Sequence, residues 1–314
     1  MSETTPVTRK AKRPATTGPR GVRWLLDAGF KYWALAPALA ILALLTLYPA
    51  VQLIRMSFSS VGYAGGHIAW SPVGLANFTQ ILGDATAMVA FRNTLVFVAI
   101  TVACETLLGL ALALAVSESR RLSGFYRTVL MLPVLIPPIG IGAMWLMMYD
   151  FNYGFIDKVL SALHLTPQPW LATTRLAFPS ILVVDIWHWT SFLFLIILAG
   201  LESLPQDINE AAQIDGASHF QRLWHVTLPL LRPTITVAAM LRTIFAFKIF
   251  DEIYLLTNGG PGDSTQVITP YIQQVFFIQG RMGYAAALAV VTALLITIFV
   301  IVYQRVDAAL SGQG

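Results

Sequence analysis

Six apolar stretches, each about as long as a membrane span, follow one another along this chain of 314 residues. A helix needs about 20 apolar residues to cross the hydrocarbon layer, and it satisfies its own backbone hydrogen bonds there. Only 11% of the residues are charged and the mean hydropathy is +0.68, whereas about a quarter of the residues of a soluble domain are charged. The sequence therefore predicts an all-α integral membrane protein with six transmembrane helices. We expect them at residues 32–54, 93–116, 127–149, 179–201, 234–257 and 284–304.

The basic residues are divided unevenly between alternate connections, and such residues gather on the cytoplasmic side of a membrane. With the N-terminus inside, thirteen face inward and five face outward. The inward set is seven residues within 1–31, with Arg120, Arg121, Arg127, Arg222, Arg232 and Arg305; the outward set is Arg55, Arg92, Lys158, Arg175 and Arg281. Both termini are therefore expected in the cytoplasm.

Residues 1–31 are predicted to be a disordered, basic cytoplasmic arm, and residues 306–314 a short cytoplasmic tail. The arm carries Arg9, Lys10, Lys12, Arg13, Arg20 and Arg23 among Pro, Thr and Gly. Contact with the membrane surface is favoured over the alternative, nucleic-acid binding. The first apolar stretch is too long for a signal peptide and lacks a small-residue cleavage site, so we expect it to be retained. Cys104 is the only cysteine, which excludes an intramolecular disulfide.

Three prolines interrupt the third apolar stretch: Pro133, Pro137 and Pro138. Proline removes a backbone donor and clashes with the preceding turn, so this helix is expected to kink or break. A packing kink and a bent helix lining a pore are both consistent with the pattern. The connections 56–92 and 150–178 are expected to be long external loops.

The connection between the fourth and fifth stretches predicts two short helices, within residues 203–229, joined by a tight turn. Ser203–Gln206 and Ser218–Gln221 each match a helix-start pattern, and Gly216 suits the left-handed end of the first helix. The second helix should carry one apolar stripe, composed of Phe220, Leu223, Trp224, Thr227 and Leu228.

The polar face of the first short helix is acidic, with Asp207, Glu210 and Asp215 and no basic residue. A helix resting on lipid headgroups would instead present Lys and Arg to them. The charge pattern therefore favours docking to a soluble protein.

The same segment reads Glu210-Ala211-Ala212, three residues, Gly216, nine residues, Val226-Thr227-Leu228-Pro229. This spacing resembles the cytoplasmic signature of permease subunits of binding-protein-dependent ABC importers, with Val226 in place of the usual Ile. The resemblance implies that the two short helices sit in a groove of the ATP-binding subunit. It assigns that contact to Glu210, Ala211, Ala212, Asp215, Gly216 and Ala217.

A second run, Phe247 to Gly262, reads F-K-I-F-D-E-I-Y-L-L-T-N-G-G-P-G. It resembles the carbohydrate-uptake permeases of the maltose and glycerol-3-phosphate type, as does Gly283-Tyr284-Ala285-Ala286-Ala287. The resemblance implies a type I importer permease fold in a bacterial or archaeal plasma membrane. It further implies a second related permease, two ATP-binding subunits that hold ATP and Mg, and an external sugar-binding protein. A homodimer is the alternative to the permease pair.

No pattern in the chain predicts an enzyme, a bound metal or a cofactor of its own. Gly259–Thr265 is rich in glycine, but no lysine precedes its hydroxyl residues as in a phosphate loop. The five histidines do not have zinc-protease spacing, and no Ser-His-Asp arrangement can be argued.

Charged and aromatic residues inside the fourth and fifth stretches are candidates for a substrate pathway, because a charge inside a bilayer is costly unless it is paired or hydrated. The candidates are Asp185, Trp187, His188 and Trp189 in the fourth stretch and Lys248, Asp251, Glu252 and Tyr254 in the fifth. Rings that stack on sugars and carboxylates that accept hydroxyl hydrogens would suit a carbohydrate. The alternative is a structural ion pair of Lys248 with Asp185 or Asp251. Glu105 and Arg242 are expected to be paired structurally.

An ion-gradient secondary transporter is the rival function, with Asp185, Glu105 and Lys248 as an ion relay. It would explain buried charges and a broken third helix. It gives no reason for an acidic pair of cytoplasmic helices, so the ATP-driven importer is preferred.

Overall fold

The computed structural model describes residues 20–64, 67–118, 123–310 and 312. Arg9, Lys10, Lys12, Arg13, Gly65, Gly66, Arg120 and Arg121 lie outside the described residues. The contacts divide the chain into two units, Met1–Gln52 and Leu53–Gly314, and each is described by itself.

The described part of the first unit belongs to one long helix, α1 (Arg20–Ser57). The apolar section of this helix is Ala34–Ser57. The prediction that the whole segment 1–31 is a disordered arm is therefore wrong from Arg20 onward. Helix α1 continues without a break from this segment into the apolar stretch.

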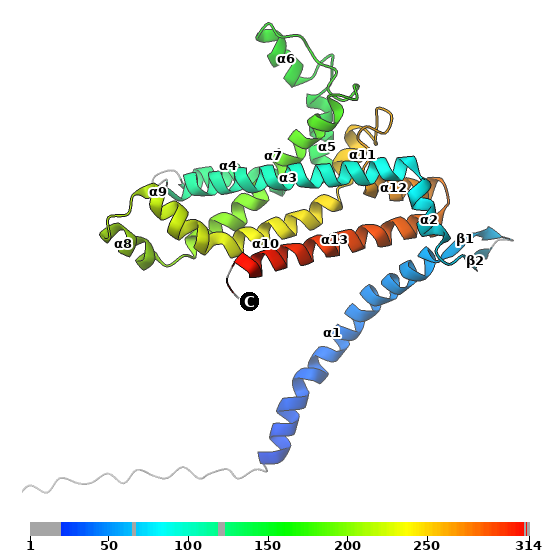
Figure 1. Cartoon of the computed structure of the whole chain (residues 1–314), viewed down its shortest axis with the longest axis horizontal. Coiled ribbons are helices and arrows are strands. Elements are labelled where there is room, and N and C mark those ends of the chain that lie inside the picture. Colours follow the sequence, from blue (N-terminus) through cyan, green and yellow to red (C-terminus); the bar gives the residue numbers. More distant parts are fainter. Residues whose placement is uncertain (1–19, 65–66, 119–122, 311, 313–314) are drawn as a thin grey trace, which may run out of the picture. The chain divides into compact units, whose positions relative to one another are not determined.

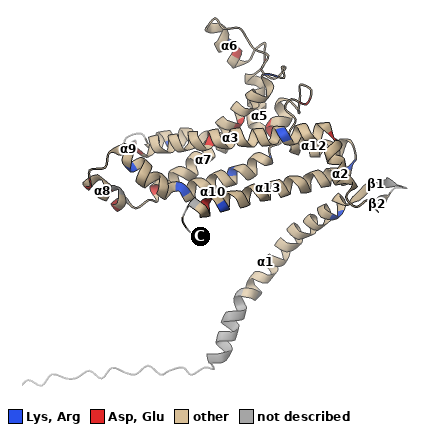
Figure 2. Ribbon diagram, in the orientation of Figure 1, with Lys and Arg blue, Asp and Glu red and all other residues tan. Residues whose placement is uncertain are grey.

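Four long helices form the bundle of the second unit: α3 (Ala85–Glu118), α7 (Ala177–Glu202), α10 (Leu228–Phe247) and α13 (Met282–Leu310) (Figure 1). Charged residues are sparse along them (Figure 2). Helix α7 is central, because its side chains belong to two of the buried apolar clusters. It packs closely on α3 at Gly109, where a Cβ atom would lie 3.0 Å from Leu193 Cβ.

The third apolar stretch is broken, as its prolines predict. Helices α4 (Ser123–Leu135) and α5 (Pro138–Met148) meet at an angle of 95°. Among the described residues, five helices are long and apolar enough to cross a membrane, and six if this bent pair counts as one span. The predicted all-helical class with six spans is confirmed.

The fifth stretch is also broken, which the sequence analysis did not predict. Helix α10 ends at Phe247 and a short helix α11 (Asp251–Leu256) follows. The hydroxyl of Thr269 donates to the Phe247 carbonyl oxygen at 3.1 Å, so one carbonyl freed at the helix end finds a partner. Helix α11 then packs on α5, where a Cβ atom at Gly142 would lie 2.8 Å from Leu255 Cδ1.

The predicted external loops contain regular structure. Residues 56–92 form an antiparallel hairpin of β1 (Ser59–Ala64) and β2 (His67–Pro72), then α2 (Ala76–Gly83) and the start of α3. The connection 150–178 contains α6 (Phe155–Ala162). Between α11 and α13 lie α12 (Ile268–Gln273) and the π-helical turn η2 (Gln274–Ile278).

The glycine-rich end of the Phe247–Gly262 run leads into a loop that is fastened to α3. The side-chain amide of Asn93 donates to the carbonyl oxygens of Asp263, Ser264 and Gln266 at 3.3, 3.2 and 3.0 Å. The hydroxyls of Thr257 and Thr265 lie 2.7 Å apart, which closes the loop on itself. The glycine-rich end of the run therefore has a structural role beside α3.

The motif Gly283–Ala287 is held by a half-buried carboxylate. Asp84 Oδ2 accepts hydrogen bonds from the hydroxyls of Tyr271 and Tyr284 at 2.6 and 2.7 Å. Burial opposes ionisation of Asp84, but these hydroxyls and the amides of Ala87 and Thr86 favour it, and together they lower its pKa. The carboxylate thereby joins α2, α12 and α13.

Candidate functional site

The connection 203–229 forms the predicted pair of helices, α8 (Gln206–Ile214) and α9 (His219–Arg222). Gly216 has a φ of +81°, and its amide donates to Gln213 O while that of Ala217 donates to Ala212 O, both at 3.0 Å. These two bonds end α8 in a Schellman arrangement, which requires a residue that tolerates positive φ. The expected role of Gly216 in the turn is confirmed.

The two predicted helix starts have different outcomes. Ser218 and Gln221 form the expected capping box, with bonds of 2.8 and 3.3 Å. The predicted cap at Ser203 is wrong, because its hydroxyl donates to Gly200 O at 2.7 Å and ends α7 instead. Pro205 precedes α8 and offers no side-chain cap.

The helix pair presents an exposed surface that is both acidic and apolar. Glu210, Ala211, Asp215 and Gly216 are exposed, and Ala212 and Ala217 are partly so. Figure 2 shows acidic residues on α8 and no basic one. Large apolar side chains share this surface: Ile208, Ile214, Phe220 and Trp224, of which Ile214 is 87% exposed.

The predicted apolar stripe of the second short helix does not act as one surface. Phe220 and Trp224 are exposed and their rings lie 5.9 Å apart, whereas Leu223, Thr227 and Leu228 turn toward the bundle and are partly buried. The stripe divides because Leu223–Thr227 form a π-helical turn, η1, rather than a regular helix.

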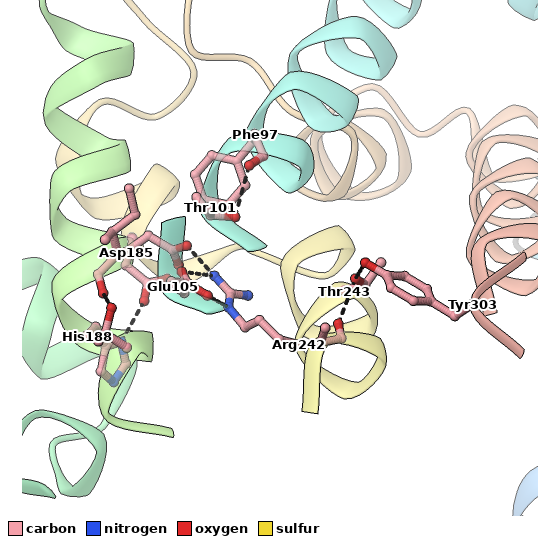
Figure 3. A network of polar contacts seen from close by, with 12 residues as sticks. Phe97, Thr101, Glu105, Asp185, His188, Arg242, Thr243 and Tyr303 are labelled. Carbon is pink, nitrogen blue, oxygen red and sulfur yellow. Dashed lines mark hydrogen bonds and ion pairs between the residues drawn. The ribbon is translucent and has the colours of Figure 1, made fainter. Parts of the chain in front are cut away.

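A buried ion cluster lies in the bundle where α3, α7 and α10 meet (Figure 3). The guanidinium of Arg242 donates to both carboxylate oxygens of Glu105, one of them at 2.9 Å, and to Oδ2 of Asp185. All three side chains are at most 1% exposed. The expected structural pairing of Glu105 with Arg242 is present.

Asp185 is only half satisfied by this cluster. Its Oδ1 atom is buried and has no hydrogen-bond partner among the described residues. Leaving a buried acceptor unpaired is costly, and the Asp185 side chain also lines an adjacent cavity. Beside it, the Arg242 guanidinium carbon lies 4.9 Å from the centre of a Trp189 ring.

A cavity of about 150 Å³ adjoins the cluster at the two helix breaks. It lies where α5 begins and where α10 gives way to α11. Its lining consists of Pro138, Asp185, Trp189, Arg242, Phe245, Lys248, Ile249, Phe250, Asp251 and Glu252. The rings of Trp189 and Phe245 stack at 5.5 Å on one side. Aromatic faces beside carboxylates can bind a polyhydroxylated molecule.

The structure brings together five of the eight predicted pathway residues around this cavity: Asp185, Trp189, Lys248, Asp251 and Glu252. His188 lies next to it, with Nδ1 3.3 Å from Glu252 Oε1. Trp187 instead lines a separate apolar cavity of about 680 Å³ between α3, α4 and α7. Tyr254 stacks on Phe250 at 5.3 Å and is 46% exposed.

The predicted alternative of a Lys248 ion pair is wrong. Asp185 pairs with Arg242, and Lys248 forms no ion pair within the described part of the chain. Helix α10 ends at Phe247 and α11 begins at Asp251. Lys248 lies between them, so it does not share a helix face with Asp251 and Glu252. The sequence analysis also missed Phe245 and Arg242 as lining residues, although Phe245 follows Arg242 by three positions on one helix face.

Cys104 is a free, partly buried thiol. Among the described residues, no group of three His, Cys, Asp or Glu side chains could hold a metal ion.

A family described as the binding-protein-dependent transport system inner membrane component matches residues 105–312. The chain belongs to this family. The match includes the helix pair, the ion cluster and the cavity, so these are features of a membrane-embedded transport permease.

This permease has similar relatives over most of its length. It is 40% identical over 234 residues to the trehalose/maltose transport system permease protein MalF of Thermococcus litoralis, covering 74% of this chain and 79% of that protein. It is 36% identical over 293 residues to the sulfoquinovosyl glycerol transport system permease protein SmoG of Agrobacterium fabrum, covering 92% of this chain and 94% of that protein.

A solved structure has the same fold. It is a chain of a bacterial ABC transporter involved in the import of the acidic polysaccharide alginate, with a TM-score of 0.79 and 22% identity, covering 92% of this chain and 99% of that chain. The permease therefore has the importer permease fold expected from the sequence.

Proposed function

We propose that this permease forms half of the pathway through which an ATP-driven importer moves a carbohydrate: a sugar, oligosaccharide, polyol or glycerol phosphate. Membership of the permease family and the names of its relatives support the class of cargo. The observation that carries the proposal is the cavity at the helix breaks, where an unpaired Asp185 oxygen lies beside stacked aromatic rings.

The cargo contacts are proposed for the residues around this cavity. Asp185, Asp251 and Glu252 would accept hydroxyl hydrogens, Lys248 would donate to a sugar oxygen, and Trp189 would cover an apolar ring face. His188 would act through Glu252, which it contacts. Trp187 and Tyr254 would contact cargo only farther along the route, since neither lines the cavity.

The acidic and apolar surface of α8 and α9 is proposed as the docking surface for an ATP-binding subunit. Glu210 and Asp215 would face basic groups, and Ala211, Ala212, Gly216 and Ala217 would allow close backbone approach. The partners would be two copies of that subunit, which bind ATP and Mg, a second related permease, and an external binding protein. ATP hydrolysis would then occur on the partner and not on this chain.

The test is uptake of radiolabelled maltose, trehalose or glycerol phosphodiester into vesicles that contain the assembled complex. An ATP-driven importer needs trapped ATP and the binding protein, and its uptake continues when uncouplers collapse ion gradients. Uptake that ignores ATP and stops with uncouplers would establish the ion-gradient rival and refute the proposal.

A further inference from the structure

The motif residues Val226–Pro229 lie beyond the proposed docking surface, at the junction between the helix pair and the bundle. From His219 to Phe247, α9, η1 and α10 run on as one helical rod. The α9 part of the proposed docking surface and Arg242 therefore lie on the same rod, and α8 joins it through the turn at Gly216. Any rotation between its two ends changes where Arg242 meets its partners.

The rod contains one wide turn. In η1 the amide of Leu228 donates to the carbonyl oxygen of Leu223, five residues back instead of four. Such a turn holds one residue more than a regular α-helical turn. One residue corresponds to about 100° of rotation and 1.5 Å of rise, so the wide turn fixes the rotation of α10 relative to α9.

Pro229 gives a physical reason for the wide turn at this place. It has no N–H, and in a regular helix its ring would collide with the carbonyl of His225. Widening the preceding turn relieves that contact. The ring of His225 supports the altered turn, since its Nδ1 lies 3.1 Å from the carbonyl oxygen of Gln221. A carbonyl can only accept, so this nitrogen carries the proton.

We propose that Pro229 is a positioning residue. By holding η1 wide, it sets the rotation of α10 that places Arg242 between Glu105 and Asp185. If η1 tightened while α9 stayed on its partner, Arg242 would turn away from both carboxylates. Movement of the docked helices would then no longer reach the ion cluster beside the cavity. This inference rests on the proposed function, because it assumes that the helix pair receives the movement.

The first test compares Pro229→Ala, Pro233→Ala and a variant of Pro229→Ala that also lacks His225, all in the assembled transporter. Pro229→Ala should lower the sugar moved per ATP hydrolysed at least about tenfold, a size typical of lost coupling between sites. Pro233→Ala is the matched control, because Pro233 lies farther inside α10 and the turn directly before it is regular α-helix. It should keep the wild-type ratio.

The decisive variant combines Pro229→Ala with deletion of His225. The deletion removes the extra residue, so a regular helix would restore the original rotation of α10, and the ratio should recover. A merely structural role for Pro229 predicts that the deletion adds damage. A wild-type ratio in Pro229→Ala, or no recovery on deletion, would overturn the proposal.

A second measurement does not depend on transport. Leu231 is fully buried and packs on α7, where a Cβ atom at Gly200 would lie 2.9 Å from its Cδ1. In a Cys104→Ala background, Leu231→Cys should react slowly with maleimide in the purified complex and several-fold faster once Pro229→Ala is added. Unchanged labelling would overturn the inference, whereas failure of wild-type uptake would count against the proposed function alone.

Discussion

At Arg242, one guanidinium pairs with two carboxylates from two other helices, and its side chain is only 1% exposed. Such a cluster is costly to desolvate, and it is retained only when geometry and hydrogen bonds offset that cost. Removing the cation would leave Glu105 and Asp185 facing each other without compensation. The residue therefore matters to the folded state as well as to the cavity that it lines.

Replacing Arg242 by Leu should destabilise the protein by about 3–5 kcal/mol, the usual effect of breaking a buried pair. The measurement is the thermal unfolding midpoint of the purified chain. Arg127→Gln is the control, because the Arg127–Glu202 pair is 38% and 46% exposed and such pairs contribute about 0–1 kcal/mol. Equal midpoints for both variants would contradict the prediction.

Asp84 should contribute a pH-dependent part of the stability. Its pKa is lower in the folded protein than the unfolded value of about 3.9. Its stabilisation is therefore complete above the unfolded pKa and is lost as the pH falls through the folded one. Asp84→Asn should lower the unfolding midpoint at neutral pH, and the difference from wild type should shrink below about pH 4. A difference that stays constant with pH would exclude this role.

At the scale of the elements, the sequence predicts structure where a local cause is present and fails where the cause is distant. The prolines at 133, 137 and 138 predict the break between α4 and α5. The break after Phe247 has no proline or glycine within it, and Thr269, whose hydroxyl bonds to the freed carbonyl oxygen, lies 22 residues along the chain. Ser218 caps a helix as its pattern indicates. Ser203 has the same pattern, but its hydroxyl donates to the Gly200 carbonyl oxygen in the last turn of α7.

The turn between α8 and α9 requires a positive φ at position 216, so a residue that disfavours positive φ should not be tolerated there. Gly216→Val should strain the turn by about 1–3 kcal/mol and tilt α9, while the chain still inserts in the membrane. We expect weaker co-purification with the ATP-binding subunit and less sugar moved per ATP. Gly124→Ala is the control, because a Cβ atom there meets open space. Full coupling in Gly216→Val would show that the turn is not required.

A charge reversal on the same pair tests the docking surface directly. Glu210→Lys should reduce binding of the ATP-binding subunit more than Glu210→Gln does, because it adds repulsion to the loss of attraction. The dissociation constant of the purified partner, measured at two salt concentrations, reports this. Equal affinities for the two variants would indicate that Glu210 does not face a charged group.

At the scale of the whole molecule, the fold class and the number of spans follow from hydropathy alone, because a bilayer admits few backbone arrangements. The arrangement of the cavity does not follow from it. Asp185, Trp189 and Lys248 come from two stretches whose contact depends on two helix breaks, and only the break at the prolines can be predicted locally. Trp187 faces a different cavity from Asp185, and the sequence analysis missed this although residues two positions apart do not share a helix face.

The proposed orientation, with both termini in the cytoplasm, can be tested with single cysteines in a Cys104→Ala background. Ser203 follows the last residue of α7, and Asn152 lies in the connection that precedes α7; both positions are exposed, and each is replaced by Cys. In intact cells stripped of an outer membrane, an impermeant maleimide should label position 152 and leave position 203 unlabelled. The reverse pattern would invert the topology and remove the helix pair from the ATP-binding side.

The loop that Asn93 fastens to α3 has a consequence for how relatives are compared. The glycines by which a carbohydrate-type permease is identified lie in the frame of the protein, away from the recess where cargo would rest. Two permeases can thus share these glycines and still carry unlike molecules. Exchanging only the side chains around the two helix interruptions between such relatives should transfer their preference, while the glycines stay untouched.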